Sequence, residues 1–105
     1  MTAATEIRIA CADGFQLPAS VFTPPAPRAV LVVAAAMGVP RCYYGKFAAD
    51  MAARGVATVT FDYRGIGDAA GALKDPRATS FQDWGRLDLH AVLGEVLARF
   101  PEVPV

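Results

Sequence analysis

Residues 56–68, with the sequence VATVTFDYRGIGD, constrain the fold of this chain more than any other segment. Residues 56–61 are mostly β-branched or aromatic, which predicts a strand. The strand passes directly into a turn that holds two glycines, an arginine and aspartates. In α/β proteins the functional residues follow the carboxyl ends of such strands. We therefore expect an α/β fold with an important turn at this point.

A second apolar run precedes this segment. Residues 29–36 are apolar throughout, as is typical of a strand that is covered on both faces of a parallel sheet. The loop 37–40, MGVP, follows, and helical spacing begins at Tyr43. Gly55 suits the left-handed residue that often follows a helix. The pattern predicts two parallel strands side by side, joined by a crossover helix. The apolar face of that helix is expected to hold Tyr44, Phe47, Ala48, Met51 and Ala52.

The first part of the chain predicts an antiparallel hairpin. Residues 6–11 and 16–22 alternate polar and apolar side chains, and Asp13 and Gly14 supply a turn between them. The segment 23–28 contains three prolines, which lack the backbone donor that a strand ladder needs. We expect it to be a connecting loop.

A long helix is predicted near the end of the chain. Ser80 and Asp83 have the spacing of a capping box, so the helix should begin near Ser80. Pro101 and Pro104 end it, and Val103 and Val105 resemble the first residues of a further strand. One apolar stripe is expected along the helix, formed by Leu89, Val92, Leu93, Val96 and Phe100.

Composition narrows the possible functions. The chain is 54% hydrophobic and 19% charged, which fits one globular domain and excludes a disordered chain. Ten basic and ten acidic side chains cancel, so nucleic acid is not an expected partner. The longest apolar stretch, 29–37, is much shorter than the roughly 20 residues of a membrane-spanning helix.

The rest of the sequence gives no sign of a secretion signal, a reactive cysteine or a cofactor site. Residues 1–6 lack the basic segment and apolar core of a secretion signal, so a cytoplasmic location is expected. Cys11 and Cys42 have no metal-type spacing and are expected to be free thiols without a catalytic role. No metal or organic cofactor is indicated.

The order of these segments resembles the N-terminal part of the α/β-hydrolase fold, and in particular the serine aminopeptidase and lysophospholipase-like branch. The resemblance runs from about Glu6 to Val105 and includes both the MGVP loop and the DYRGIG turn. It implies that the loop 37–40 lends backbone N–H groups to an oxyanion hole, with Val39 as the leading donor and Gly38 beside it. In this loop a methionine stands where the family usually has histidine.

The turn after residues 56–61 matches the family's Asp-X-Arg-Gly-X-Gly pattern, with Ala69 where serine is usual. We interpret the turn as structural, because its glycines permit a sharp change of direction and its arginine can bind loop carbonyls. Trp84 and Asp88 fit a tryptophan-to-aspartate pattern on the family's next helix, and we interpret them as a buried indole and a capping carboxylate that support the fold. The residues of the structural turn are Asp62, Arg64, Gly65 and Gly67.

The resemblance also implies that residues 1–105 are one incomplete domain. The family's nucleophile elbow, Gly-X-Ser-X-Gly, is absent from this sequence, as are its later acid and histidine. The chain's serines are Ser20 and Ser80, and its single histidine is His90. Asp88 lies two residues before His90 on one predicted helix, so these side chains diverge by about 200° and cannot act as an acid-histidine pair.

The leading hypothesis is therefore an N-terminal fragment of a serine hydrolase that is inactive alone. The complete protein would act on small-molecule esters, amides or related acyl compounds, and Tyr43 and Tyr44 are candidate substrate contacts. Substrate identity and oligomeric state are left open.

Two other functions are compatible with the sequence. The strand at 29–36 would have a neighbour on one side only, and such an apolar edge favours pairing with another polypeptide or a second copy. Residues 65–70, GIGDAA, fit a loose dinucleotide-binding pattern. Gly71 and Pro76 argue against the latter, because they delay the expected helix to Ser80.

Overall fold

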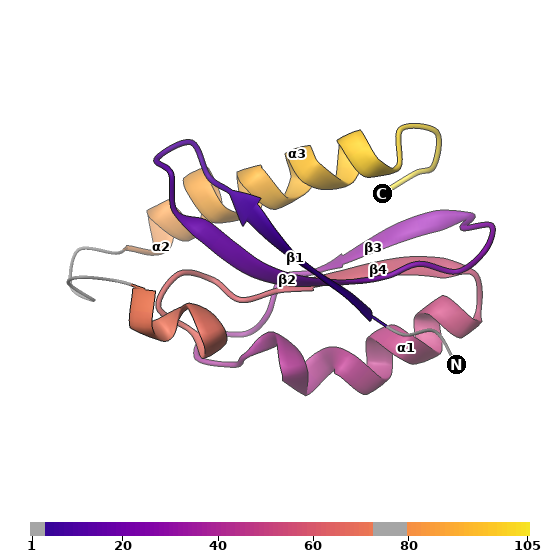
Figure 1. The fold of residues 1–105 in the computed structure, drawn as a ribbon, viewed down its shortest axis with the longest axis horizontal. Coiled ribbons are helices and arrows are strands. Elements are labelled where there is room, and N and C mark those ends of the chain that lie inside the picture. The colour runs from indigo at the N-terminus through magenta and orange to yellow at the C-terminus, as the bar shows by residue number, and fades with distance from the viewer. Residues whose placement is uncertain (1–3, 73–79) are drawn as a thin grey trace.

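Four strands form one mixed sheet within residues 4–72 and 80–105, which are the residues that the computed structural model describes. The order across the sheet is β1-β2-β4-β3 (Figure 1). The strands are β1 (Ala4–Ala10), β2 (Gln16–Phe22), β3 (Ala29–Val33) and β4 (Val56–Phe61). β1 and β2 are antiparallel, as are β2 and β4, whereas β3 and β4 are parallel.

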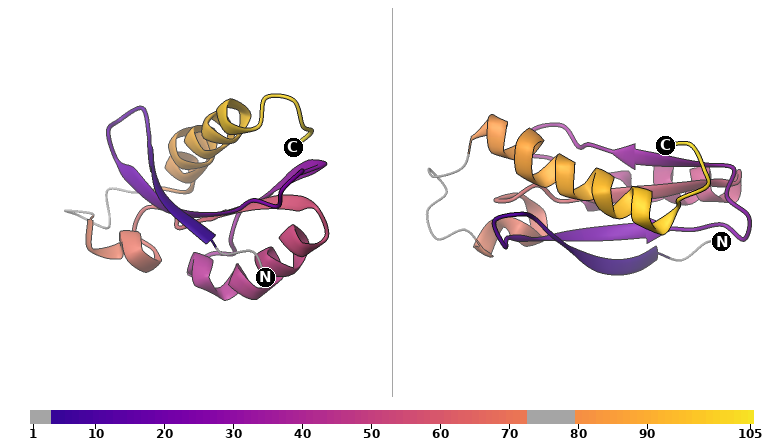
Figure 2. Two further views of the ribbon diagram at one scale, coloured as in Figure 1. Left: turned by 45° about the vertical axis from the view of Figure 1, so that its right-hand side comes forward. Right: turned by 90° about the horizontal axis from the view of Figure 1, so that it is seen from above.

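Helices cover both faces of this sheet (Figures 1 and 2). The helix α1 (Gly45–Ala53) lies on one face and α3 (His90–Arg99) lies on the other. A 3-10 turn, η1 (Arg41–Tyr44), leads into α1, and a second one, η2 (Gly67–Ala72), follows β4. A short α2 (Phe81–Asp83) and a π-helical turn, η4 (Trp84–Leu89), lead into α3.

The predicted hairpin is confirmed. β1 and β2 pair from Ala4 opposite Phe22 to Ala10 opposite Gln16, and β1 begins two residues earlier than expected. Gly14 has a φ of 89°, in the left-handed region that favours glycine. Its N–H donates to the Cys11 carbonyl over 2.9 Å and closes the turn.

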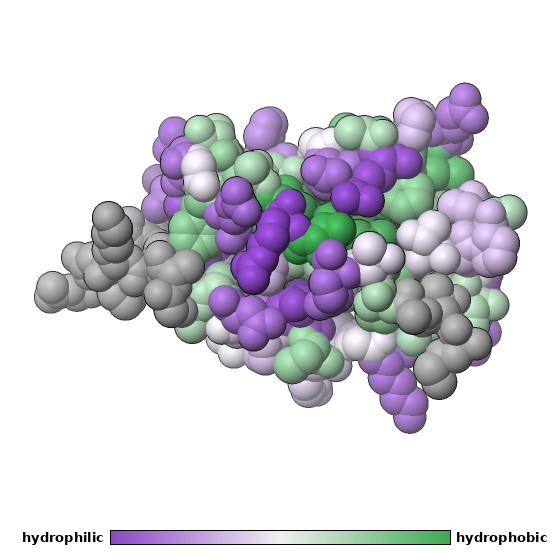
Figure 3. Space-filling model, viewed as in Figure 1, coloured by the Kyte–Doolittle hydropathy of each residue, from purple (hydrophilic) through white to green (hydrophobic). Residues whose placement is uncertain are grey.

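β4 is one of the two interior strands of the sheet, and all six of its residues are buried. The larger core lies between the sheet and α3, and the smaller one lies between the sheet and α1, where Ala48 and Ala52 pack against Phe22. Apolar residues are visible between α3 and the sheet from the side of the hairpin, where hydrophilic residues surround them (Figure 3). The larger core includes Leu17, Val59, Phe61, Val92 and Val96.

β3 is shorter than predicted and lies at the edge of the sheet. It ends at Val33, opposite Thr60, because β4 itself ends one residue later and the chain turns away. Val30 is buried, but the rest of β3 is only half-buried, which corrects the expectation of a strand covered on both faces. On the outer edge the Val30 N–H donates to the Pro104 carbonyl over 2.8 Å, so the end of the chain lies beside β3.

The apolar face of α1 differs in part from the prediction. Ala48 and Ala52 are buried, whereas Phe47 is 49% exposed. The two alanines face the sheet and allow the helix to pack closely on it. With these residues inward, the Phe47 ring lies at the edge of the contact between the helix and the sheet, where it is partly exposed. Gly55 follows the helix with a φ of 87°, as predicted, and its N–H donates to the Ala52 carbonyl over 3.0 Å.

The capping box of the last helical segment is confirmed. The Ser80 N–H donates to Asp83 Oδ2 over 3.2 Å, and the Asp83 N–H donates to Ser80 Oγ over 3.3 Å. The buried row then follows a four-residue spacing through Asp88, Val92 and Val96. Leu93 is 38% exposed, so its predicted place on the apolar stripe was wrong. The helix is rotated so that Asp88, Val92 and Val96 face the sheet, and this rotation leaves Leu93 at the surface.

Within the described part of the chain, no helix combines the length and the apolar character that crossing a membrane requires.

Candidate functional site

The loop after β3 contains a tight turn at the position of the predicted oxyanion donor. The Val39 N–H donates to the Ala36 carbonyl over 3.0 Å. Gly38 has a φ of 77°, which is the conformation that the third residue of a type II turn requires. Met37 is 68% exposed at the tip. The Val39 N–H is therefore engaged inside its own loop in this structure.

Two side chains hold the ends of this loop. Tyr44 Oη accepts a hydrogen bond from the Ala36 N–H over 3.2 Å. Asp62 Oδ1 accepts one from the Arg41 N–H over 2.6 Å. The first anchor comes from η1 and the second from the end of β4, so the loop is tied to two separate elements.

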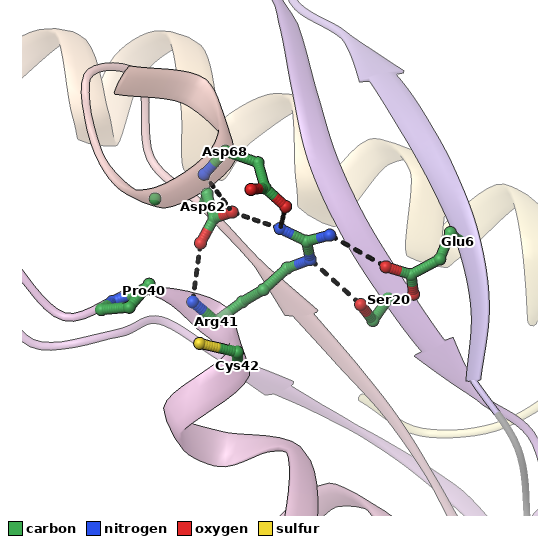
Figure 4. A pocket seen from close by; sticks show the side chains of 8 residues that line it. Glu6, Ser20, Pro40, Arg41, Cys42, Asp62 and Asp68 are labelled. Atoms are coloured by element: carbon green, nitrogen blue, oxygen red, sulfur yellow. Dashed lines mark hydrogen bonds and ion pairs between the residues drawn. The ribbon is translucent and has the colours of Figure 1, made fainter. Parts of the chain in front are cut away.

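The Arg41 side chain forms a charged network that the sequence did not indicate (Figure 4). Its guanidinium pairs with Glu6 at 2.8 Å, with Asp68 at 2.9 Å and with Asp62. Its Nε donates to Ser20 Oγ over 3.0 Å. Burial alone would lower the pKa of Arg41, but the carboxylates outweigh it and raise that pKa, so the guanidinium stays charged.

This network lines a surface pocket between the hairpin and the loops that follow β3 and β4 (Figure 4). The Ser20 hydroxyl and Arg41 lower the pKa of the Glu6 carboxyl. Three carboxylates face one guanidinium, so the pocket is acidic overall. Its lining residues are Glu6, Ser20, Pro40, Arg41, Cys42, Asp62, Gly67 and Asp68.

Asp62 anchors the turn after β4 as well as the loop. The carboxylate is 1% exposed, and Oδ2 accepts the Asp68 N–H over 3.2 Å. Gly67 has a φ of 54°, and a Cβ at this position would lie 2.7 Å from Asp62 Oδ1. Gly65 also has a positive φ, of 84°. The turn therefore closes tightly around a buried carboxylate.

The helix η2 begins inside this turn, where the sequence predicted irregular chain as far as Ser80. The dinucleotide interpretation gains nothing from it, because the Asp68 N–H already binds the Asp62 carboxylate. A phosphate at these amides would have to displace a buried negative charge of the protein itself.

Arg64 forms a second buried ion cluster. Its Nε donates to Asp88 Oδ1 over 2.7 Å, and its backbone N–H donates to Asp88 Oδ2 over 2.8 Å. Its Nη1 pairs with Asp13 at 2.7 Å, and this bond lowers the pKa of the Asp13 carboxyl. The guanidinium also lies 4.7 Å from the centre of the Phe15 ring. Arg64 thus binds carboxylates where loop carbonyls were expected, and Asp88 is an ion-pair partner where a helix cap was expected.

Trp84 lies beside this cluster. Its ring stacks on Tyr63 with centroids 4.6 Å apart and an interplanar angle of 14°. It is half-buried, where the sequence suggested a buried indole.

The two cysteines have different surroundings. Cys11 is buried, and its thiol donates to Asp88 Oδ1 over 3.6 Å, whereas Cys42 is exposed. Burial, together with the Asp88 charge, raises the pKa of Cys11 to about 11. Both cysteines are free, as the sequence predicted.

We expect one thiol of the native chain to react with Ellman's reagent at pH 8. At that pH roughly one Cys11 thiol in a thousand is ionised, and the side chain is shielded from the reagent. Two thiols should react in guanidinium chloride, and the native reaction should vanish in Cys42→Ser. Fast reaction of two thiols in the native chain would contradict the burial of Cys11.

The tyrosines and serines take separate roles. Tyr43 is 76% exposed, and its ring meets that of Tyr44 edge to face at 5.2 Å. The Ser20 hydroxyl belongs to the Arg41 network, and Ser80 caps a helix. Within residues 4–72 and 80–105, no hydrogen bond joins His90 to either serine.

The sheet order, with a glycine loop after β3 and a charged turn after β4 held together at one edge, is shared with solved structures of α/β hydrolases. The structure is similar to that of a thermostable carboxyl esterase from Bacillus coagulans, with a TM-score of 0.80 and 20% identity. It is also similar to XC6422 from Xanthomonas campestris, an α/β serine hydrolase without a lid, with a TM-score of 0.67 and 21% identity.

These alignments cover nearly all of this chain but a minor part of the other proteins. They span 99% of this chain and 35% of the esterase, and 96% of this chain and 47% of XC6422. The sequence matches no protein-family model and no curated protein. The chain thus has the fold of one part of an α/β hydrolase and spans between a third and a half of the length of these neighbours.

Proposed function

We propose that this chain is the N-terminal part of a serine hydrolase that acts on small-molecule esters, amides or related acyl compounds. The observation that carries the proposal is the loop 36–41, which lies at the carboxyl edge of β3 and β4 and is held there by Tyr44 and Asp62. A backbone donor at this edge is suitably placed for an acyl oxygen.

In this proposal Val39, with Gly38 beside it, supplies the oxyanion donor of the complete protein. Of the two candidate substrate contacts, Tyr43 has its ring exposed close to the loop, whereas the Tyr44 hydroxyl accepts the Ala36 N–H. Asp62, Arg64, Gly65 and Gly67 maintain the turn that supports the loop. The cytoplasmic location stays a prediction.

The same proposal makes the 105-residue chain inactive alone. Ser20 and Ser80 are both engaged in structural hydrogen bonds, and neither forms a pair with His90 among the described residues. A Ser-His-Asp mechanism requires a serine hydroxyl that is hydrogen-bonded to a histidine, which is in turn hydrogen-bonded to a carboxylate. Hydrolysis of p-nitrophenyl butyrate by the purified chain that persists after Ser20→Ala and Ser80→Ala would contradict the proposal.

A fluorophosphonate probe, which labels the active serine of hydrolases, provides the direct test in extracts of the native source. We expect a labelled protein larger than 11.1 kDa that yields tryptic peptides of this sequence. Heat-denatured extract is the control and should lose the label. A native protein of 11.1 kDa that does not react with the probe would contradict the proposal.

A further inference from the structure

We propose that Tyr44 is a positioning residue for the loop that carries the Val39 N–H, with Asp62 fixing the opposite end. This inference rests on the proposed function, because it assigns a role to a loop whose catalytic use is itself proposed. It arises from the hydrogen bonds of segment 36–41, which join each end of the segment to a different element.

The end at Arg41 is fixed by a buried group. Asp62 is 1% exposed, and its Oδ1 accepts the Arg41 N–H over 2.6 Å. Its other oxygen accepts the Asp68 N–H and pairs with the Arg41 guanidinium. A carboxylate held by three donors has little freedom to move. Pro40, directly before Arg41, restricts the backbone further, with a φ of −73°.

The end at Ala36 depends on one hydroxyl. Tyr44 Oη accepts the Ala36 N–H, and the Ala36 carbonyl in turn accepts the Val39 N–H over 3.0 Å. Ala36 therefore connects the hydroxyl to the proposed donor. Tyr44 ends the η1 turn, which continues directly into α1, so the hydroxyl is held by an element packed on the sheet.

This arrangement limits how the donor can become available. The Val39 N–H is taken by the Ala36 carbonyl, so donation to a substrate oxygen requires that bond to lengthen. With both ends held, the change stays within residues 36–41 and the donor keeps its place at the sheet edge. Loss of the Tyr44 hydroxyl would remove the hydrogen bond that holds the Ala36 N–H, so the position of the Val39 N–H would vary more. A backbone donor in a variable position stabilises a developing negative charge poorly.

Tyr44→Phe tests this role because it removes the hydroxyl and keeps the ring. We expect the Ala36 and Val39 amides of the purified chain to exchange with solvent about three- to tenfold faster, measured by NMR, since a single hydrogen bond is lost. The amides of β4 should stay far better protected than these two, and the midpoint of urea unfolding should fall by no more than the loss of one hydrogen bond allows. Tyr43→Phe is the matched control, and its exchange should equal that of the unchanged chain. Equal exchange in Tyr44→Phe, or equal acceleration in both variants, would overturn the proposal.

The catalytic part of the role needs the probe-reactive native protein. There, Tyr44→Phe should slow the maximal rate of fluorophosphonate labelling severalfold and leave the probe concentration at half-maximal rate unchanged. The exchange result does not depend on hydrolase activity, so it separates failure of this inference from failure of the proposed function. Faster exchange with unchanged labelling would overturn the positioning role.

Discussion

Gly67→Ala is expected to lower the free energy of unfolding by about 2–5 kcal/mol, because two costs combine at one position. The backbone φ of 54° is unfavourable for a residue with a Cβ, and overpacking adds a further steric cost. The new Cβ would lie 2.7–2.8 Å from all three carboxyl atoms of Asp62. Asp62 cannot yield readily, because Arg41 and Asp68 hold it.

Gly14→Ala is the control for this prediction. Gly14 has a φ of 89°, but no atom lies within 4 Å of a Cβ built there. The variant should lose only about 1–2 kcal/mol, which is the backbone cost alone. Urea unfolding followed by circular dichroism measures both variants. If Gly67→Ala and Gly14→Ala lowered the free energy of unfolding equally, the Asp62 carboxylate would not require a glycine at position 67.

Arg64→Met is expected to lower the free energy of unfolding by about 3–5 kcal/mol, because it leaves a buried charge without its partner. The Asp88 side chain is 0% exposed and that of Arg64 is 7% exposed, so water does not replace the lost guanidinium. Replacing Asp88 as well, in Arg64→Met with Asp88→Leu, should recover part of the loss, since the uncompensated carboxylate is then gone.

The pair of Arg99 and Glu95 provides the comparison. These side chains are 40% and 34% exposed, and Arg99→Met should cost less than about 0.5 kcal/mol. The same urea titration measures all of these variants. A loss in Arg64→Met no larger than that in Arg99→Met would mean that the Arg64 cluster contributes nothing to stability.

Local features of the fold were predictable because local chemistry determines them. Alternation and the Asp13-Gly14 turn gave the hairpin. Gly55 marked the end of α1, and Ser80 with Asp83 formed the expected capping box. Each of these signals depends on residues within a few positions of one another.

The charged networks could not be predicted in the same way. Arg41 follows the MGVP loop in the sequence, and nothing in its neighbourhood indicates that it is largely buried among carboxylates 21 to 35 positions away. Arg64 likewise forms ion pairs with Asp13 and Asp88 out of the ten acidic residues of the chain. Which acidic residues become partners depends on the three-dimensional position of each strand end. The exposure of Phe47 and Leu93 has a related origin, because helix rotation depends on the packing of the sheet.

The Arg41 network also has a consequence for the order of folding. Its partners lie on β1, β2 and the end of β4 and in η2, and each contact closes a loop of 21 to 35 residues. Loop closure costs entropy before the contact returns any energy. We therefore expect the network to form when the last of these elements arrives, after the transition state for folding, and such late interactions slow unfolding more than they speed folding. Arg41 is thus expected to slow the unfolding of the assembled sheet.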